Sequence, residues 1–223
     1  MRKMYTFTLA HAGVNPRLRL ALLLLPALLW LATPQTAQAA ACDPTVTVTV
    51  TSTVNSGAGS LRQAIAGVCP GGTIDFAAGL SGQTITLSSP LTITRGMTIR
   101  STAPITVSGN NAVRIFTISA GVAIDGLTLR NGAALDGGAV YATGWLTLTN
   151  SHLLSNTAQG GAGGALYLGS GGDLSNVWVQ DNRAKDGGGI ASFGRLSVTG
   201  STIDTNTATG TNLGGGGIFI SGA

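Results

Sequence analysis

Hydrophobic and polar residues follow one repeating pattern through the C-terminal half of the chain. The clearest copy ends at Asn156, and two further copies end at Asn182 and Asn206. An earlier copy has Gly132 in the place of the asparagine, so the four end positions are 24, 26 and 24 residues apart. A fixed period of roughly 20 to 50 residues is typical of stacked-repeat architectures. The other repeating positions are Val122, Ile124, Leu127 and Leu129; Leu146, Leu148, Ser151 and Leu153; Leu174, Val177 and Val179; and Leu196, Val198, Ser201 and Ile203.

Apolar residues two positions apart predict short strands with one inward face. Leu196 and Val198 belong to one such strand, and Ser201 and Ile203 begin the next. An antiparallel meander would reverse direction at every turn and would not keep one residue type at one place in each copy. A coil does keep it. The pattern therefore predicts an all-β fold, a parallel β-helix or solenoid.

The asparagines that end the copies form a predicted structural ladder. If the copies stack about 4.8 Å apart, Asn156, Asn182 and Asn206 lie in one file at a turn, and the apolar residues three positions earlier form an inward file. Asparagine tolerates the left-handed conformation, and its side chain can bond the backbone of the neighbouring coil. We expect these residues to close the turns.

Glycine doublets precede an apolar residue in each copy. The distance between the asparagine and the doublet varies, whereas the strands keep their length. Insertions therefore collect on one loop per coil, where such scaffolds usually carry function. The doublets are Gly137-Gly138, Gly163-Gly164, Gly188-Gly189 and Gly216-Gly217, before Val140, Leu166, Ile190 and Ile218.

Residues 40–72 are predicted to form a strand and a cap for the stack, and residues 73–223 are predicted to form its coils. Thr45 to Val54 alternates strictly between polar and apolar residues, as a half-buried strand does. Ser60 stands three residues before Gln63, the capping-box spacing that begins a short helix. Such a helix is suited to cover the open apolar end of a repeat stack. Further strands are predicted at 84–87, 91–94, 97–99, 105–107 and 113–118.

Residues 1–39 have the pattern of a signal peptide. Four basic residues precede the apolar run 20–32, and Ala37-Gln38-Ala39 follows it. This order predicts export with cleavage before Ala40. An uncleaved anchor is the alternative, although the run is shorter than the roughly 20 residues of a spanning helix and contains Pro26.

The net charge of +4 comes from this leader. It holds four of the 12 basic residues, so residues 40–223 carry eight basic and eight acidic residues. Nucleic-acid binding needs a concentrated basic surface, and we predict no nucleic-acid partner. A charged fraction of 9% with 34 glycines fits small polar residues on β-structure and argues against a helical bundle.

Cys42 and Cys69 both follow the predicted cleavage site. Export delivers them to an oxidising compartment, which favours a disulfide between them. Lipidation of Cys42 after Ala39-Ala40-Ala41 is the alternative.

These motifs resemble those of right-handed parallel β-helix proteins of the pectate-lyase-like superfamily. The glycine doublets and the apolar-x-x-Asn segments are similar to the GGAI and FxxN repeats of chlamydial polymorphic outer-membrane proteins, with aliphatic residues in the Phe place. The segment from Gly59 to Ile65 is similar to the CSLREA region that opens many secreted bacterial β-helix proteins. The resemblance implies a secreted, cell-surface or outer-membrane protein.

Sugar-cleaving β-helices need clustered carboxylates. The nearest candidates for catalytic residues are Asp181 and Asp204, which the repeat places as diagonal neighbours rather than as a facing pair. Solvated turn residues are the alternative interpretation. One histidine beyond the leader and two cysteines next to it do not build a triad or a metal site, so we predict no cofactor and no metal.

His152 and Trp178 share one outward place with Thr202. An exposed histidine and tryptophan can stack on a sugar ring, which predicts a glycan contact. Packing beneath a neighbouring loop is the other interpretation.

The sequence therefore predicts an exported β-helix with a structural or adhesive role and a surface glycan or another cell-surface protein as partner. Membrane attachment would occur only through the leader or a C-terminal anchor. The alternative is a β-helical polysaccharide lyase or glycoside hydrolase, or a fragment of one. The last residues, Gly217 to Ala223, begin a new strand, which predicts that the natural protein continues.

Overall fold

A computed structural model describes residues 42–210 and 215–221. From Cys42 onward the chain forms one compact unit. The predicted leader, residues 1–39, lies outside the described residues, so the signal peptide stays a prediction.

Short strands in this unit form three sheets, which we name A, B and C. Sheet A has 11 strands, sheet B six and sheet C four. Sheet A contains β1 (Thr47–Val50), β2 (Thr73–Phe76), β3 (Thr84–Thr86), β5 (Met97–Ser108), β7 (Val122–Arg130), β10 (Leu146–Thr149), β11 (His152–Leu154), β14 (Gly171–Ser175), β15 (Trp178–Gln180), β18 (Arg195–Thr199) and β19 (Thr202–Asp204). Sheet B contains β4 (Leu91–Ile93), β6 (Phe116–Ile118), β9 (Val140–Ala142), β13 (Leu166–Leu168), β17 (Ile190–Ser192) and β21 (Ile218–Ile220). Sheet C contains β8 (Ala133–Ala134), β12 (Thr157–Ala158), β16 (Arg183–Ala184) and β20 (Thr207–Ala208).

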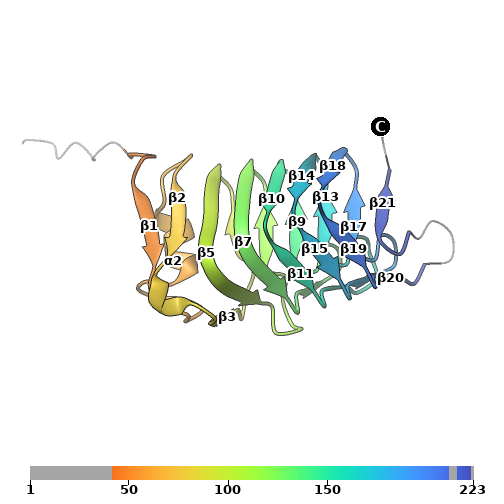
Figure 1. Cartoon of the computed structure of the whole chain (residues 1–223), viewed down its shortest axis with the longest axis horizontal. Helices are drawn as coiled ribbons and strands as arrows, with labels where there is room; N and C mark the ends of the chain where they lie inside the picture. Colours follow the sequence, from red (N-terminus) through yellow and green to blue (C-terminus); the bar gives the residue numbers. More distant parts are fainter. Residues whose placement is uncertain (1–41, 211–214, 222–223) are drawn as a thin grey trace, which may run out of the picture. The chain divides into compact units, whose positions relative to one another are not determined.

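The described strands pair in parallel, each with the strand one coil away. The longest path through sheet A runs β1-β2-β5-β7-β10-β14-β18, one strand per coil, and these strands lie side by side in Figure 1. Sheets B and C show the same order of successive coils. From β2 onward the chain passes from sheet A to sheet B, by way of sheet C from β8 onward, and returns to sheet A one coil later. The parallel β-helix predicted from the repeat is therefore confirmed.

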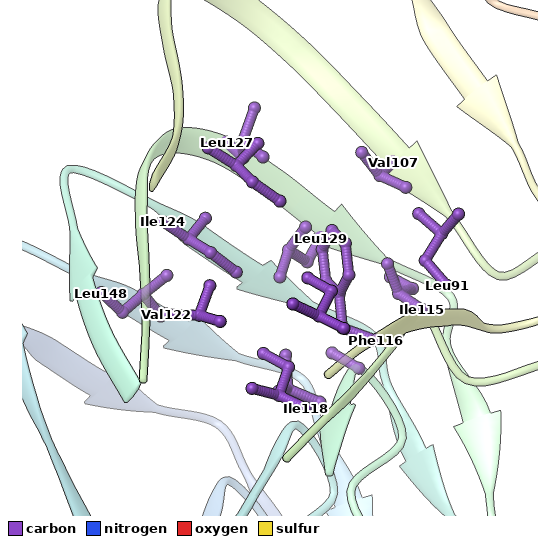
Figure 2. Close-up of a cluster of buried hydrophobic side chains, with 14 of the residues drawn as sticks. Leu91, Val107, Ile115, Phe116, Ile118, Val122, Ile124, Leu127, Leu129 and Leu148 are labelled. Atoms are coloured by element: carbon purple, nitrogen blue, oxygen red, sulfur yellow. The ribbon is translucent and has the colours of Figure 1, made fainter. Parts of the chain in front are cut away.

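The predicted inward file is also confirmed. Leu153 pairs with Val179 and Val179 with Ile203. Leu153 and Val179 are fully buried, and Ile203 packs partly buried against the same core. Figure 2 shows how side chains from sheets A and B meet in this core, with Phe116 of β6 beside Leu129 of β7.

The early coils differ from the predicted strand pattern. The segments 97–99 and 105–107 belong to one strand, β5, whose register shifts between Arg100 and Ile105. Later coils divide this face into two strands, and Ser151 and Ser201 lie at the division. The Ser151 hydroxyl accepts a hydrogen bond from Leu127 N at 3.2 Å and donates one to Thr149 O at 2.6 Å. The repeating serine therefore satisfies backbone groups that the turn removes from the ladder.

The capping helix is α2, Leu61–Gly67, which packs against β1 and buries Leu61, Ala64 and Ile65. The Ser60 hydroxyl accepts a hydrogen bond from Gln63 N at 3.2 Å, and Gln63 Oε1 accepts one from Gly59 N at 2.8 Å. The predicted strand Thr45 to Val54 was too long. β1 ends at Val50 because Thr51 N and Ser52 N both donate to Gly59 O, which turns the chain toward the helix.

The predicted disulfide is confirmed. Cys42 and Cys69 are bonded with their Cα atoms 5.6 Å apart, and no free cysteine occurs in the described residues. The bond ties the start of this unit to the segment that follows α2.

We expect the double substitution Cys42→Ser and Cys69→Ser to lower the free energy of unfolding by about 3.5 kcal/mol, the loop entropy of a closed segment of this length. Urea unfolding followed by circular dichroism measures the change. Replacement of Ser56, an exposed serine, by alanine serves as a control that should stay within about 0.5 kcal/mol. An oxidised wild type no more stable than the double variant would contradict the role of this bond.

The asparagines form a continuous hydrogen-bonded ladder. Asn182 Oδ1 accepts from Asn156 N at 2.8 Å, and Asn206 Oδ1 accepts from Asn182 N at 3.1 Å. Asn156 Oδ1 accepts from Gly132 N at 2.8 Å, so the glycine copy also belongs to the ladder. Each side-chain nitrogen also donates to a backbone carbonyl of the preceding coil, and the acceptors are Leu129 O, Leu153 O and Val179 O.

The left-handed residue of this turn lies one position before the ladder, so the expectation that the asparagines themselves provide it was wrong. Ser155, Asp181 and Thr205 have φ of 53°, 56° and 52°. This turn places the next side chain inward, where the asparagine amide supplies both an acceptor for a backbone N–H and a donor for a backbone carbonyl of the preceding coil.

The glycine doublets stack in a register that differs from the predicted one in the last two coils. Ile190 pairs with Leu166, which makes Gly187-Gly188 the counterpart of Gly163-Gly164. Gly187 has a φ of +56°, like Gly163 at +68°, and Gly189 takes the place of Ala165. Because that coil has three consecutive glycines, two alignments with Gly163-Gly164 are compatible with the sequence.

Candidate binding face

The predicted glycan-contact residues lie on the outward face of sheet A. His152 pairs with Thr128 on one side and with Trp178 on the other, and Trp178 pairs with Thr202. Their neighbours in each strand, Leu153 among them, point inward and are buried. Strand alternation therefore puts an imidazole and an indole next to each other on the surface, between two threonines.

The two rings are in contact but do not cover one another. Their centroids are 4.7 Å apart and their planes meet at 59°. The Trp178 side chain is 37% exposed, and His152 is partly exposed. A tilted pair leaves part of the indole face open, and that open face can pack against a sugar ring or an apolar side chain.

A network of polar side chains borders the pair at the turn between the two halves of sheet A. Asn176 Nδ2 donates to Asn150 Oδ1 at 2.7 Å, and Asn150 Nδ2 donates to Asp125 Oδ1 at 2.8 Å. The Thr149 hydroxyl donates to the same carboxylate oxygen at 2.8 Å. These side chains are held by one another across three coils, which gives the face a rigid polar border.

The structure does not bring the two catalytic candidates together. Asp204 pairs with Gln180, whereas Asp181 N donates to the hydroxyl of Thr205 at 3.3 Å, so the carboxylates belong to different files. Both are exposed. Within the described ranges no three His, Cys, Asp or Glu side chains are grouped to hold a metal ion.

The outward face of sheet B carries a file of aromatic rings that was not predicted from the sequence. Tyr141 and Tyr167 stack with centroids 4.6 Å apart and planes at 17°. Phe193 lies 4.9 Å from Tyr167 and 6.1 Å from Phe219. The sequence does contain a signal, because each tyrosine stands between two apolar residues directly after a glycine doublet segment. Phe193 fits no strand position, since Ala191 pairs with Tyr167 and Phe193 follows two residues later.

Arg114 covers the N-terminal end of this aromatic file. Its guanidinium lies 4.9 Å from the ring centroid of Tyr141 and donates to the carbonyl oxygens of Gly137 at 3.1 Å and Asp136 at 2.8 Å. Burial lowers the pKa of Arg114 and raises the pKa of the Tyr167 phenol. Rings that stack face to face offer mainly their edges to solvent, so this file packs the surface of sheet B rather than presenting an open aromatic face.

A scan against protein-family models, a search of curated proteins and a search of solved structures each return no match. In residues 42–210 and 215–221, no helix has the length and apolar character needed to cross a membrane.

Proposed function

We propose that this chain is an exported, surface-associated β-helix with an adhesive role, and that the outward face of sheet A contacts a surface glycan. The observation that carries the proposal is the open indole of Trp178 beside His152, with threonines on both sides. The leader pattern and the resemblance of the repeats to those of surface β-helix proteins support export. Another cell-surface protein is the alternative partner.

The rigidity of the scaffold supports a binding role. Both rings project from strands that are paired on two sides, and the core residues beneath them are fully buried. Binding of a partner therefore costs little free energy for ordering this face, because its side chains are already held in position. The positions of Asp181 and Asp204 do not favour cleavage chemistry.

We further propose cleavage before Ala40 and an unlipidated Cys42. The disulfide supports this, because the thiol of Cys42 that a lipid would occupy is bonded to Cys69. Mass spectrometry of the mature protein is expected to give an N-terminus at Ala40 and a mass that includes one disulfide. A diacylglycerol adduct on Cys42 would contradict the proposal.

We expect Trp178→Ala to weaken binding to a glycan array, or to whole cells that bind the wild type, by about tenfold or more, because a central aromatic contact contributes more than about 1.4 kcal/mol. Leu135→Ala is the matched control, since Leu135 is a large apolar residue, 67% exposed, away from sheet A. Circular dichroism establishes that both variants are folded. Equal loss in both variants, or in neither, would contradict a contact at this face.

The enzyme alternative has its own assay. We expect incubation with polygalacturonate, with and without calcium, to release no unsaturated products and no reducing ends. Turnover that is abolished in Asp181→Asn and in Asp204→Asn would overturn the adhesive proposal, because both residues are exposed and asparagine also tolerates the left-handed conformation of Asp181.

A further inference from the structure

A hollow on sheet A lies at the start of its strands, in the coil that contains His152 and in the three coils before it. It is a groove of about 380 Å³ whose lining includes Gly71, Gly96, Gly121 and Trp145, together with Thr98 and Thr147. This volume is within the range of small-ligand sites, roughly 300 to 1,000 Å³. We propose that this groove binds one sugar ring of a neutral glycan, with the ring packed on Trp145.

The strand register explains why the groove exists. Met97 pairs with Val122, and Val122 with Leu146, so the preceding residues Gly96, Gly121 and Trp145 occupy one place in three successive coils. Two coils have no side chain at this place and the third has an indole. The side of Trp145 that faces the earlier coils therefore has no neighbouring side chain in its file.

The next outward file deepens the same hollow. Thr98 pairs with Ala123, and Ala123 with Thr147. The coil of Gly121 thus contributes only a hydrogen and a methyl group to the outer face, while the threonines rise on both sides. Two strand spacings, about 10 Å, separate the threonine strands.

A hydrogen bond holds the indole in place. Trp145 Nε1 donates to Asp173 Oδ2 at 3.2 Å, toward the later coil and away from the groove. Because the N–H has its partner, the indole offers the groove its apolar ring surface in a fixed orientation.

Gly121 has no structural reason to be glycine. Its φ is not in the left-handed region, and a Cβ atom built on it would meet no atom within 4 Å. Glycine costs backbone entropy that alanine would not, about 0.5–1 kcal/mol, so the absence of a side chain here destabilises the fold without a packing benefit. Its effect is to keep the groove open.

The chemistry of the lining selects the ligand. None of the lining residues is ionisable, so neither an anion nor a cation finds a counter-charge there. A sugar ring has apolar C–H faces and a rim of hydroxyls, which match the indole wall and the two threonine hydroxyls, each a donor and an acceptor. A purely apolar ligand would leave the hydroxyls unpaired. This groove shares no residue with the His152 and Trp178 face, so each proposal can fail alone.

Saturation-transfer NMR and calorimetric titration of the full chain with cellohexaose, xylohexaose, mannohexaose and chitohexaose test the proposal. We expect binding of at least one of them, a loss of tenfold or more in affinity in Trp145→Ala, and a similar loss in Gly121→Leu, whose side chain fills the groove. Thr147→Val should weaken binding more modestly, and a hexamer of galacturonic acid should bind worse than the neutral sugars.

Trp178→Ala separates this site from the proposed adhesive face. Retained binding of the hexasaccharide in Trp178→Ala, with loss in Trp145→Ala, supports the groove. Loss in Trp178→Ala with binding unchanged in Trp145→Ala and Gly121→Leu overturns the groove while leaving the adhesive face intact. Failure of all four neutral hexasaccharides to bind also overturns it. Thermal unfolding of each variant near the wild-type temperature shows that a loss of binding is local.

Discussion

Replacement of Asn182 by alanine is expected to lower the free energy of unfolding by about 5 kcal/mol. The side chain is 1% exposed and connects three coils, because its Nδ2 also donates to Asn206 Oδ1 of the next coil at 2.9 Å. Its Oδ1 accepts from Asn156 N at 2.8 Å and from Asn156 Nδ2 at 3.0 Å, and its Nδ2 donates to Leu153 O at 2.9 Å. Alanine would leave these buried groups without partners, at about 1–3 kcal/mol each. The shift of the urea midpoint, followed by circular dichroism, measures the loss.

Asn176→Gly is the matched control. Asn176 is also an asparagine of a turn between coils, with a φ of +55° that glycine adopts without strain, but it is exposed and donates to Asn150. Its substitution should change the unfolding free energy by less than about 1 kcal/mol. Similar losses in the two variants would mean that the ladder is no more important than a surface asparagine pair.

Gly164→Ala is expected to destabilise the fold by about 4 kcal/mol or more. A Cβ atom there would collide with the carbonyl oxygen of Gly188 in the next coil and would lie 2.6 Å from Arg183 N. Both neighbours are backbone, so the collision can be relieved only by moving paired strands, and overpacking of a rigid site costs 1–3 kcal/mol even where side chains can shift. Thermal unfolding of the purified variant measures the effect.

Gly121→Ala makes the same chemical change at a place where the new methyl group meets no atom within 4 Å. It should leave stability unchanged or raise it by up to about 1 kcal/mol, because alanine reduces the entropy of the unfolded chain. Equal changes in stability in Gly164→Ala and Gly121→Ala would contradict the close approach of successive coils at Gly164.

Much of the fold was predictable because a coil repeats its environment. Leu153, Val179 and Ile203 recur at one place since each faces the same core, and the asparagines recur since each closes the same turn. The capping helix was predictable from local chemistry, namely the spacing of Ser60 and Gln63. Cys42 and Cys69 could be paired because the predicted mature chain has only these two cysteines.

The finer register was not predictable from the same signals. Three consecutive glycines at 187–189 allow two alignments with Gly163-Gly164, and only the pairing of Ile190 with Leu166 decides between them. Phe193 lies outside the repeat positions and still packs against Tyr167, because the small Ala191 leaves room above the tyrosine. Such contacts depend on which side chains are missing in the adjacent coil, and the sequence of one coil does not contain that information.

The candidate sites were likewise predictable only in part. The sequence placed His152 and Trp178 in one outward file, since strand alternation and the period suffice for that, whereas the 59° tilt that leaves the indole open depends on how the rings pack. The groove at Trp145 was not anticipated at all, because it is made by absent side chains at Gly96 and Gly121.

By itself, the sequence determined the coil, its inward files, its ladder and its cap, because period and alternation are properties of the chain alone. The tertiary structure decided the left-handed residue before each ladder asparagine, the glycine register and the open surfaces of Trp145 and Trp178. The physical reason is that hydrogen-bonded pairing brings residues about 25 positions apart to within one strand spacing, and only there do the size and orientation of each side chain decide what remains open to a partner.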